Sequence, residues 1–481
     1  MASSYQVFLD VGVVYVIYPK DGTDESQTAI IEEKVRAHAV PTTVYTSQTA
    51  SVGINFWLAT LSHESADILA VELAHEIASI YPQLPTDSYN PRYDTFDQTT
   101  AITYQDKPEP PNSIAEHLVF VCQEKGRSLQ EYEGRYYYDN ADPLPGRNIP
   151  VYIVDTGATL DHKEFDAIRE KVEWIHVGQD IGGGNANDDS STDPSTDPDN
   201  RYNVGKAHGT AMLSLVTGAQ VGVSKGAKPY LVRMPRRIIP KGTSGNRSGQ
   251  STNEDWLEGI SKVNDHLAGR CSETRAILLL AIFIPRSSFR RDGKDCSAGF
   301  DARMRFLLND LVSKGVLPIT GAGNDTNMGT TIDGFPANYG RTDYRPIPEL
   351  MVVGGVHSSA FALGSPTDFD RGLPHIFAPS QAIKCADGNR GLWGMMERDD
   401  TYRSATSSSC AAAITVGLAA YFLRLAQIGR LEINTSPLGL KNFILSDDLK
   451  WSRCSHTNGR ELPAIWNGVK LPEPRSFFGS F

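Results

Sequence analysis

The chain has 481 residues, of which 40% are hydrophobic and 21% charged, a length and composition typical of a globular protein of two or three domains. Its formal net charge is −11, from 46 basic and 57 acidic residues, which makes nucleic acid and anionic membrane surfaces poor partners. No apolar run looks long enough to cross a bilayer. From the charge and the apolar runs together we expect no nucleic-acid partner and no membrane partner.

The cysteines and the N-terminal residues bear on the compartment. Six cysteines are scattered without a C-x-x-C pair, which argues against a zinc site and a dense disulfide scaffold, while one or two disulfides stay open. They are Cys122, Cys271, Cys296, Cys385, Cys410 and Cys454. The stretch MASSYQVFLDVGVVYVIYPK is apolar but lacks a basic segment, so it predicts a strand rather than a signal peptide. An intracellular location is therefore favoured, and secretion stays open.

Residues 1–83 predict a small α+β domain. YQVFLDVGVVYVIYP predicts a strand, and ESQTAIIEEKVRAH has the apolar spacing of a helix. INFWLATL predicts a second strand, SHESADILAVELAHE a second helix that Ser62 would cap, and IASIYP a third strand. Strands and helices in this alternation and at this size are typical of a small α+β fold.

The rest of the chain predicts a linker, a large domain and an extension. Residues 84–147 form a linker and connector, because 84–112 are rich in Pro, Asp and Thr and 114–140 change from a helical to an aromatic pattern. In 148–430, strands such as IPVYIVD, AILLLAIFI and VLPITGAG alternate with helices such as HGTAMLSLVTG. This alternation predicts a parallel α/β sheet with helices on both faces. Residues 431–481 are a C-terminal extension.

Two predicted elements place an acid and a base at one sheet edge. The strand IPVYIVD ends at Asp155, and ligands bind at the carboxyl ends of parallel strands. A carboxylate leaving a buried strand needs a partner, and histidine is the usual one in acyl-transfer sites. His208 begins the helix HGTAMLSLVTG, where a neutral imidazole suits a general base. The alternatives are a turn cap for Asp155 and a surface side chain for His208.

A third strand end carries an amide. VLPITGAGND leads from a buried strand through glycines to Asn324. A side-chain amide there can donate to a developing oxyanion, and the alternative is an asparagine in a turn. The chain order is aspartate, histidine, asparagine and then a serine-rich helix start, which is the order of the subtilisins.

With these residues the chain resembles the subtilisin-like serine peptidases of the S8 family. VYIVDTGATLDHKEF resembles the family's aspartate motif, AHGTAMLSLVTG its histidine helix, and ITGAGND with GFPANYG its asparagine segment and the following turn. FWLATLSHESADILAVELAHEIASIYP is similar to the family's inhibitor propeptide. The resemblance covers about 10–83 and 148–428. It implies a subtilisin-like parallel α/β sheet preceded by a small α+β propeptide-like domain, which would itself be a partner of the larger domain.

The register of the serine motif selects one nucleophile. In the family pattern G-T-S-x-A-x-P-x-x-x-G the serine precedes a helix glycine by eight residues, and Gly417 then selects Ser409. Aligning ATS with G-T-S selects Ser407 as the alternative nucleophile, but that register needs two extra residues. The first helical turn suits the nucleophile because free N–H groups and the helix dipole stabilise negative charge there. We expect the helix to start at Cys410, with Ser407 or Ser408 as its cap.

The resemblance implies a serine endopeptidase. Ser409 would attack the scissile carbonyl, His208 would accept its proton and Asp155 would orient the imidazole. Asn324 and the backbone N–H of Ser409 would hold the oxyanion. The rivals are a peptide ligase or cyclase that uses the same acyl-enzyme, and a non-catalytic relative that binds peptide.

Departures from the family pattern bear on the substrate, which we expect to be a peptide or protein. Ser407 and Ser408 stand where the family has Gly-Thr. The segment Ala281–Ile284 replaces a serine- and glycine-rich strand edge, so its large side chains would crowd the primary specificity pocket. We expect no catalytic metal and no other cofactor. The acidic loop 185–200 leaves a structural calcium open, but its Asp spacing is unlike an EF-hand and favours a solvated loop.

Overall fold

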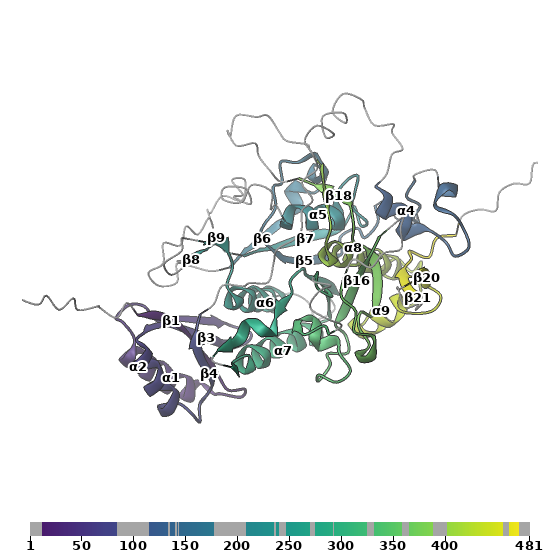
Figure 1. The fold of residues 1–481 in the computed structure, drawn as a ribbon. Coiled ribbons are helices and arrows are strands. Elements are labelled where there is room, and N and C mark those ends of the chain that lie inside the picture. Colours follow the sequence, from purple (N-terminus) through teal and green to yellow (C-terminus); the bar gives the residue numbers. More distant parts are fainter. Residues whose placement is uncertain are drawn as a thin grey trace, which may run out of the picture.

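The structure is a computed structural model, and it contains an N-terminal module and a larger sheet with its helices (Figure 1). It describes residues 12–83, 115–177, 208–324, 331–357, 365–387 and 402–470, with short gaps at 133–134, 140–141, 143, 235–236, 240–246, 270–274, 292 and 456–460. The N-terminal module is the part that comprises residues 12–83.

The N-terminal module is an antiparallel sheet with two helices on one face. Its elements are β1 (Val13–Pro19), α1 (Glu25–His38), β2 (Tyr45–Thr49), β3 (Gly53–Leu61), α2 (His63–Glu72) and β4 (Ile77–Pro82). The strand order is β2-β3-β1-β4, and each neighbouring pair is antiparallel. The predicted strands and helices are present, although residues 5–11 of the first predicted strand lie outside the described residues. β2 is an additional strand, which the polar sequence YTSQT does not predict because it lacks apolar alternation.

Local hydrogen bonds determine where the two helices of the module begin. Asp24 accepts the backbone N–H of Gln27, and the Gln27 side chain accepts the backbone N–H of Asp24. The hydroxyl of Ser62 accepts the backbone N–H of Ser65, which confirms the predicted cap of α2. These bonds satisfy N–H groups that have no partner within the helix, so the helix starts follow from the local sequence.

The main sheet is parallel except at one edge. Its strands are β5 (Pro150–Asp155), β6 (Glu173–His176), β7 (Lys228–Arg233), β10 (Ala276–Leu280), β14 (Val316–Gly321), β16 (Met351–Val356), β17 (Ile376–Pro379), β20 (Lys450–Ser455) and β21 (Glu461–Ile465). Among the described residues they lie in the order β20-β21-β17-β16-β14-β10-β5-β7-β6. Only the β20–β21 pairing is antiparallel within this part of the sheet.

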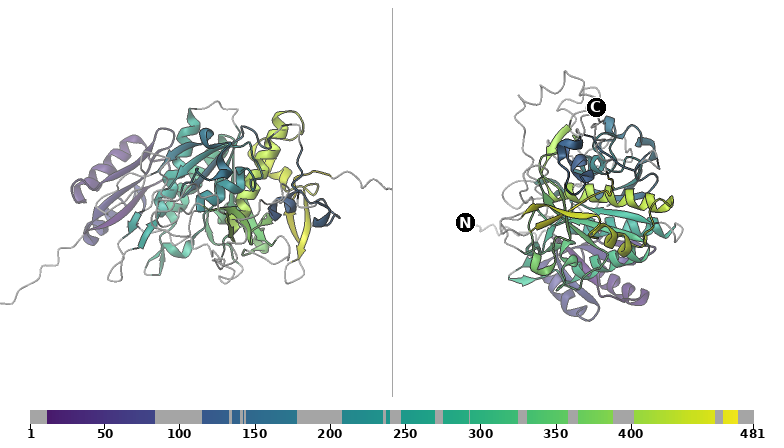
Figure 2. Two further views of the ribbon diagram at one scale, coloured as in Figure 1. Left: turned by 90° about the horizontal axis from the view of Figure 1, so that it is seen from above. Right: turned by 90° about the vertical axis from the view of Figure 1, so that its right-hand side faces the viewer.

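Helices cover both faces of this sheet (Figures 1 and 2). They are α4 (Glu116–Cys122), α5 (His208–Thr217), α6 (Asn253–Ala268), α7 (Ala298–Ser313), α8 (Ser408–Gln427) and α9 (Pro437–Ile444). On β5, Val151 and Ile153 belong to the core with α4, α5, α8 and α9, whereas Tyr152 and Val154 belong to the core with α6 and α7. Alternate strand residues thus face opposite layers, which confirms the predicted parallel α/β sheet with helices on both faces.

Short two-stranded ribbons make up the other described strands. They pair β8 (Arg237–Ile239) with β9 (Arg247–Gln250), β11 (Ile284–Pro285) with β15 (Gly334–Phe335), β12 (Arg290–Arg291) with β13 (Lys294–Asp295), and β18 (Ile383–Ala386) with β19 (Tyr402–Ala405). The β11–β15 ribbon matters for the site, because it follows the turn that leaves β10.

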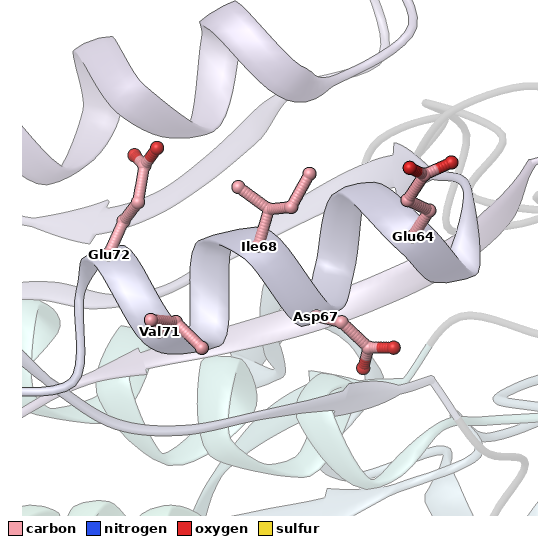
Figure 3. Close-up of a pocket in the computed structure, with 5 residues that line it drawn as sticks. All are labelled: Glu64, Asp67, Ile68, Val71 and Glu72. Carbon is pink, nitrogen blue, oxygen red and sulfur yellow. The ribbon is translucent and has the colours of Figure 1, made fainter.

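The N-terminal module lies against the α6 and α7 face of the larger part (Figure 2). One face of its sheet, including Val16, Tyr18 and Phe56, belongs to the same apolar core as Leu257 of α6 and Phe300 of α7. The opposite face packs on α1 and α2. An open hollow of α2 is lined by Glu64, Asp67, Ile68, Val71 and Glu72 (Figure 3), and Figures 1 and 2 place α2 on the outer side of the module, away from α5 and α8.

Helix α8 runs through the centre of the molecule. Within the described residues it is long and apolar enough to cross a membrane, so the expectation that no such run exists is wrong by length and composition. However, 89% of that stretch is buried inside the protein, as in a core helix. A Cβ on Gly417 would lie 2.7 Å from Cβ of Val223, so the glycine allows α8 to approach the segment that follows α5.

Several element boundaries differ from the predicted ones. β10 ends at Leu280, four residues before the predicted strand AILLLAIFI ends, because the chain turns away to form β11. α8 starts at Ser408 rather than Cys410. No predicted element corresponds to α6. α9, β20 and β21 lie in the region predicted as a C-terminal extension, and β21 pairs in parallel with β17, so these residues enlarge the main sheet.

Candidate active site

Asp155 is the last residue of β5 and lies at the carboxyl edge of the sheet. Its side chain is buried, and its Oδ1 accepts the backbone N–H of Thr156 at 2.7 Å. A buried carboxylate is costly unless hydrogen bonds compensate for lost water. The Thr156 N–H supplies one such bond and fixes the orientation of the carboxylate.

His208 is the first described residue of α5 and provides the second partner of this carboxylate. Its Nδ1 lies 2.8 Å from each of the two carboxylate oxygens of Asp155. Because a carboxylate only accepts hydrogen bonds, Nδ1 carries the proton, and Nε2 of the neutral ring is then the proton acceptor. The predicted association of Asp155 with His208 is therefore present in the structure, and both side chains are buried.

Glycines and threonines around this pair explain why the helix starts so close to the strand end. Gly157 has φ +107°, a conformation that favours glycine. A Cβ on Gly209 would lie 2.0 Å from the carbonyl oxygen of Gly157, so any larger residue would push the helix away. Thr156 Oγ1 accepts the Gly209 N–H at 3.1 Å, and Thr210 Oγ1 accepts a backbone N–H of the same loop at 2.9 Å. These contacts hold the start of α5 against the end of β5.

Asn324 follows β14, and its amide contacts the start of α8. Its Oδ1 accepts the backbone N–H of Ser408 at 2.7 Å and the hydroxyl of Ser407 at 3.2 Å. With Oδ1 fixed in this way, Nδ2 is the donor that the amide offers on its other side. Asn324 as a residue is exposed.

The three consecutive serines at the start of α8 are buried and have different roles. Ser407 is the N-cap, and its hydroxyl accepts the backbone N–H of Ser409 at 3.0 Å. The hydroxyl of Ser408 accepts the backbone N–H of Gly323 at 3.1 Å, which ties the helix to the end of β14. The hydroxyls of Ser407 and Ser408 therefore make structural hydrogen bonds, as expected for serines at a helix start. Ser409 lies in the first turn, as predicted for the nucleophile.

The Asp155–His208 pair and Asn324 lie at the same edge of the sheet. β5, which ends at Asp155, and β14, which leads to Asn324, are both parallel neighbours of β10. The carboxyl ends of parallel strands lie at the same edge. α5 and α8 also pack side by side in one apolar core on this sheet (Figure 1).

The segment Ala281–Ile284 differs from its predicted arrangement. Ile282 and Ile284 are buried in the core with α6 and α7, so they do not face the site as predicted. Phe283 is half-buried, and its ring lies against two glycines: a Cβ on Gly334 would be 2.4 Å from Cζ, and one on Gly323 would be 3.2 Å from the ring. Of these large side chains, Phe283 is thus the one beside the residue that precedes Asn324. The alternation of side chains after the strand could have indicated this.

The described residues contain no group of three or more His, Cys, Asp or Glu side chains arranged to hold a metal ion. The acidic loop 185–200, which leaves a structural calcium open, lies outside the described residues. Cys122, Cys296, Cys385 and Cys410 are free thiols. Burial raises the pKa of the Cys385 thiol to about 11, so this thiol stays protonated and unreactive near neutral pH.

Comparison with known proteins gives a family match and distant relatives. A model of the subtilase family matches residues 146–446. The chain is similar to a cuticle-degrading serine protease of Orbilia oligospora, with 22% identity over 327 residues, 68% of this chain and 60% of that protein. It is also similar to subtilisin-like protease 3 of Pseudogymnoascus destructans, with 24% identity over 321 residues, 64% of this chain and 61% of that protein. The chain thus spans about 60% of the length of these curated relatives.

Solved structures with a similar fold cover nearly the whole chain. One is the epidermin leader peptide processing serine protease of Staphylococcus aureus, with a TM-score of 0.57, 13% identity, and coverage of 95% of this chain and 98% of that one. Another is fervidolysin of Fervidobacterium pennivorans, a keratinolytic enzyme related to subtilisin, with a TM-score of 0.53, 15% identity, and coverage of 96% and 62%. At such identities the likeness concerns the fold, and it agrees with the parallel sheet described above.

Proposed function

Because the chain belongs to the subtilase family, we propose that it is a serine endopeptidase that cleaves peptide bonds through an acyl-enzyme. Ser409 is the nucleophile, His208 the general base and Asp155 the residue that orients His208. The observation that carries this proposal is the contact of His208 Nδ1 with both carboxylate oxygens of Asp155, each at 2.8 Å. This contact leaves Nε2 as the proton acceptor, which is the form of imidazole that a general base requires.

The proposed reaction uses these three residues in turn. Ser409 Oγ attacks the carbonyl carbon of the scissile bond while its proton passes to His208 Nε2. The buried carboxylate of Asp155 stabilises the imidazolium that forms, because a charge pair is stronger where water is excluded. His208 then gives the proton to the leaving amine. Water releases the acyl group by the same steps, and no cofactor takes part.

The oxyanion of the tetrahedral intermediate accepts hydrogen bonds from Asn324 Nδ2 and the backbone N–H of Ser409. Support comes from Asn324 Oδ1, which is fixed by Ser408 and Ser407 and so orients the amide. The first turn of α8 adds N–H groups and the positive end of the helix dipole. Because these bonds hold the Asn324 amide in advance, that donor can stabilise the transition state without reorganising during the reaction.

The substrate in this proposal is a peptide with a small side chain on the acyl side of the scissile bond. Phe283 lies against Gly323, the residue before Asn324, and against Gly334. A substrate whose carbonyl lies at Asn324 brings its own side chain close to this ring. Phe283→Ala should raise the relative rate for large hydrophobic residues at this position about tenfold, measured with paired peptide substrates. An unchanged preference would contradict this role.

The N-terminal module is proposed to be an inhibitor and folding aid for the larger part. Support comes from its contacts with α6, where polar side chains recur every three or four residues and each meets a partner on the module. The hydrogen-bonded pairs are Tyr18–Glu254, Tyr45–Glu258, Asn55–Ser261 and Ser51–Asp265, at 2.7–3.1 Å. Expression without residues 1–112 should then yield poorly folded protein. A well-folded, thermally stable product would contradict the proposal.

A fluorophosphonate probe tests the catalytic proposal. The full-length chain should gain the mass of one probe on Ser409, and Ser409→Ala should gain none. Mass spectrometry of products from a peptide substrate separates hydrolysis from ligation or cyclisation, which the comparisons do not favour. A parent chain that stays unlabelled would point to the peptide-binding alternative.

A further inference from the structure

The Ser407 hydroxyl contacts both residues that the proposed reaction uses for the oxyanion, at the N–H of Ser409 and at the amide oxygen of Asn324. Its oxygen accepts the backbone N–H of Ser409 at 3.0 Å. The same hydroxyl donates to Asn324 Oδ1 at 3.2 Å. Ser407 is 3% exposed, so bulk water is largely excluded from it.

We propose that the Ser407 hydroxyl engages the Ser409 N–H, one of the two oxyanion donors, in the resting protein and has to release it before a substrate carbonyl can be activated. This inference rests on the proposed function. The Ser409 N–H is a single donor that already points at an oxygen 3.0 Å away. A reacting carbonyl oxygen needs that N–H at a similar distance, about 2.7–3.1 Å, so the two oxygens compete for one donor.

The Ser407 hydroxyl and the substrate oxygen do not compete equally, so the bond from Ser409 to Ser407 is compatible with activity. A developing oxyanion carries charge, and hydrogen bonds to a charged acceptor are about twice as strong as those to a neutral one. A neutral hydroxyl therefore yields to the transition state but resists a ground-state carbonyl. Ser407 would slow acylation by the cost of breaking its own bond to Ser409, which corresponds to about a fivefold decrease in rate for a typical net hydrogen bond.

A merely structural cap would behave differently. Ser407 is the N-cap of α8, and removal of a cap lowers stability without changing the acylation rate. Its backbone has φ −169° and ψ 146°, an extended conformation that alanine and threonine also adopt, so substitutions do not strain the chain. Ser436 provides a matched control, since it caps α9 by accepting the Gly439 N–H at 3.1 Å and lies outside the site.

The experiment measures the second-order rate of fluorophosphonate labelling for the full-length parent and three variants, with intact mass to count the label. Ser407→Ala should label about fivefold faster than the parent. Ser407→Thr keeps a hydroxyl and should stay within twofold of the parent. Ser436→Ala should lose thermal stability as Ser407→Ala does, but its labelling rate should not change.

Every other labelling result supports or overturns the inference about Ser407. An unchanged rate for Ser407→Ala with a labelled parent would overturn the inference and leave the proposed function standing, with Ser407 as a cap. Slower labelling of Ser407→Ala would also overturn it and show that the hydroxyl assists the reaction. If Ser407→Ala is labelled and the parent is not, the hydroxyl blocks the site completely. If neither is labelled, the inference and the proposed function fail together.

Discussion

The starts of α5 and α8 carry the two halves of the proposed site, and they are built differently. At α5, the side chains with a chemical role, Asp155 and His208, bond to each other, while the neighbouring Thr156 and Thr210 hold the backbone. At α8, one set of adjacent serines provides the cap, the tie to β14 and the proposed nucleophile.

The acid and base at α5 are therefore arranged in advance, whereas the polar groups at the start of α8 form hydrogen bonds with one another. At α5 the structural and chemical roles belong to different residues, so the acid and base are already in contact in the structure. At α8 the cap hydroxyl of Ser407 bonds to the same N–H that the reaction would use. A matching motif thus does not ensure that its groups are available, and variants at the two helix starts should respond differently.

The largest effect is expected at Ser409. Ser409→Ala leaves His208 without a hydroxyl to activate, and loss of a triad nucleophile typically lowers turnover by about 10⁶. Probe labelling and peptide cleavage should both disappear, while Ser407→Ala should still carry the probe on Ser409. Labelling that persists in Ser409→Ala and vanishes in Ser407→Ala would shift the register of the nucleophile by two residues.

Asp155→Asn tests the α5 half. An asparagine amide can donate to Nδ1 and so favour the wrong imidazole tautomer, which in such triads lowers turnover by about 10⁴. The rate of peptide cleavage measures this loss. Asp166→Asn is the control, because it removes a carboxylate from the same region that is exposed and paired with Arg169. Equal rates for Asp155→Asn and the control would refute the orienting role of Asp155.

Asn324→Ala tests the α8 half. Loss of one oxyanion donor typically costs about 10²–10³ in turnover. Asn324→Asp keeps an oxygen that can accept the Ser408 N–H but lacks the Nδ2 donor, so it should be at least as slow while α8 keeps its contact. If the aspartate variant instead retains parental turnover, the amide only anchors the helix.

The smallest effect is expected at the module interface, away from both helix starts. Burial raises the pKa of Glu254 to about 7, with a further contribution from Asp255, while its bond from Tyr18 opposes the rise. A raised pKa means that the folded state prefers the protonated acid. The contribution of protonated Glu254 to folding stability is fully present below the ordinary pKa of 4.5 and is lost as pH rises through about 7.

Thermal unfolding at pH 5 and pH 8 measures this contribution. Glu254→Gln cannot ionise, so the parent should lose about 1–3 kcal/mol relative to this variant between the two pH values. Cleavage chemistry at Ser409 does not enter the measurement. A difference in stability that is the same at both pH values would show that Glu254 keeps one protonation state across this range.

Local signals allowed much of the fold to be predicted. ESQTAIIEEKVRAH and IASIYP correspond to α1 and β4 as predicted, because helical spacing and a short apolar run are properties of neighbouring residues. No predicted element matched α6, although Thr252 and Asp255 form a capping box and Leu257, Ile260 and Val263 recur at helical spacing. Polar residues such as Glu254 and Glu258 weakened that pattern, and in the folded chain both are buried and accept hydrogen bonds from tyrosines of the module.

The sequence by itself determined the family and the order of the motifs, together with the register that relates Ser409 to Gly417. These depend on residue identity and spacing, which a chain carries before it folds. Only the tertiary structure decided that Phe283, and not Ile282 or Ile284, lies beside the residue before Asn324, and that the Ser408 hydroxyl bonds to the Gly323 N–H. Both depend on where β10 ends and on how closely α8 approaches β14, and packing between distant segments sets these positions.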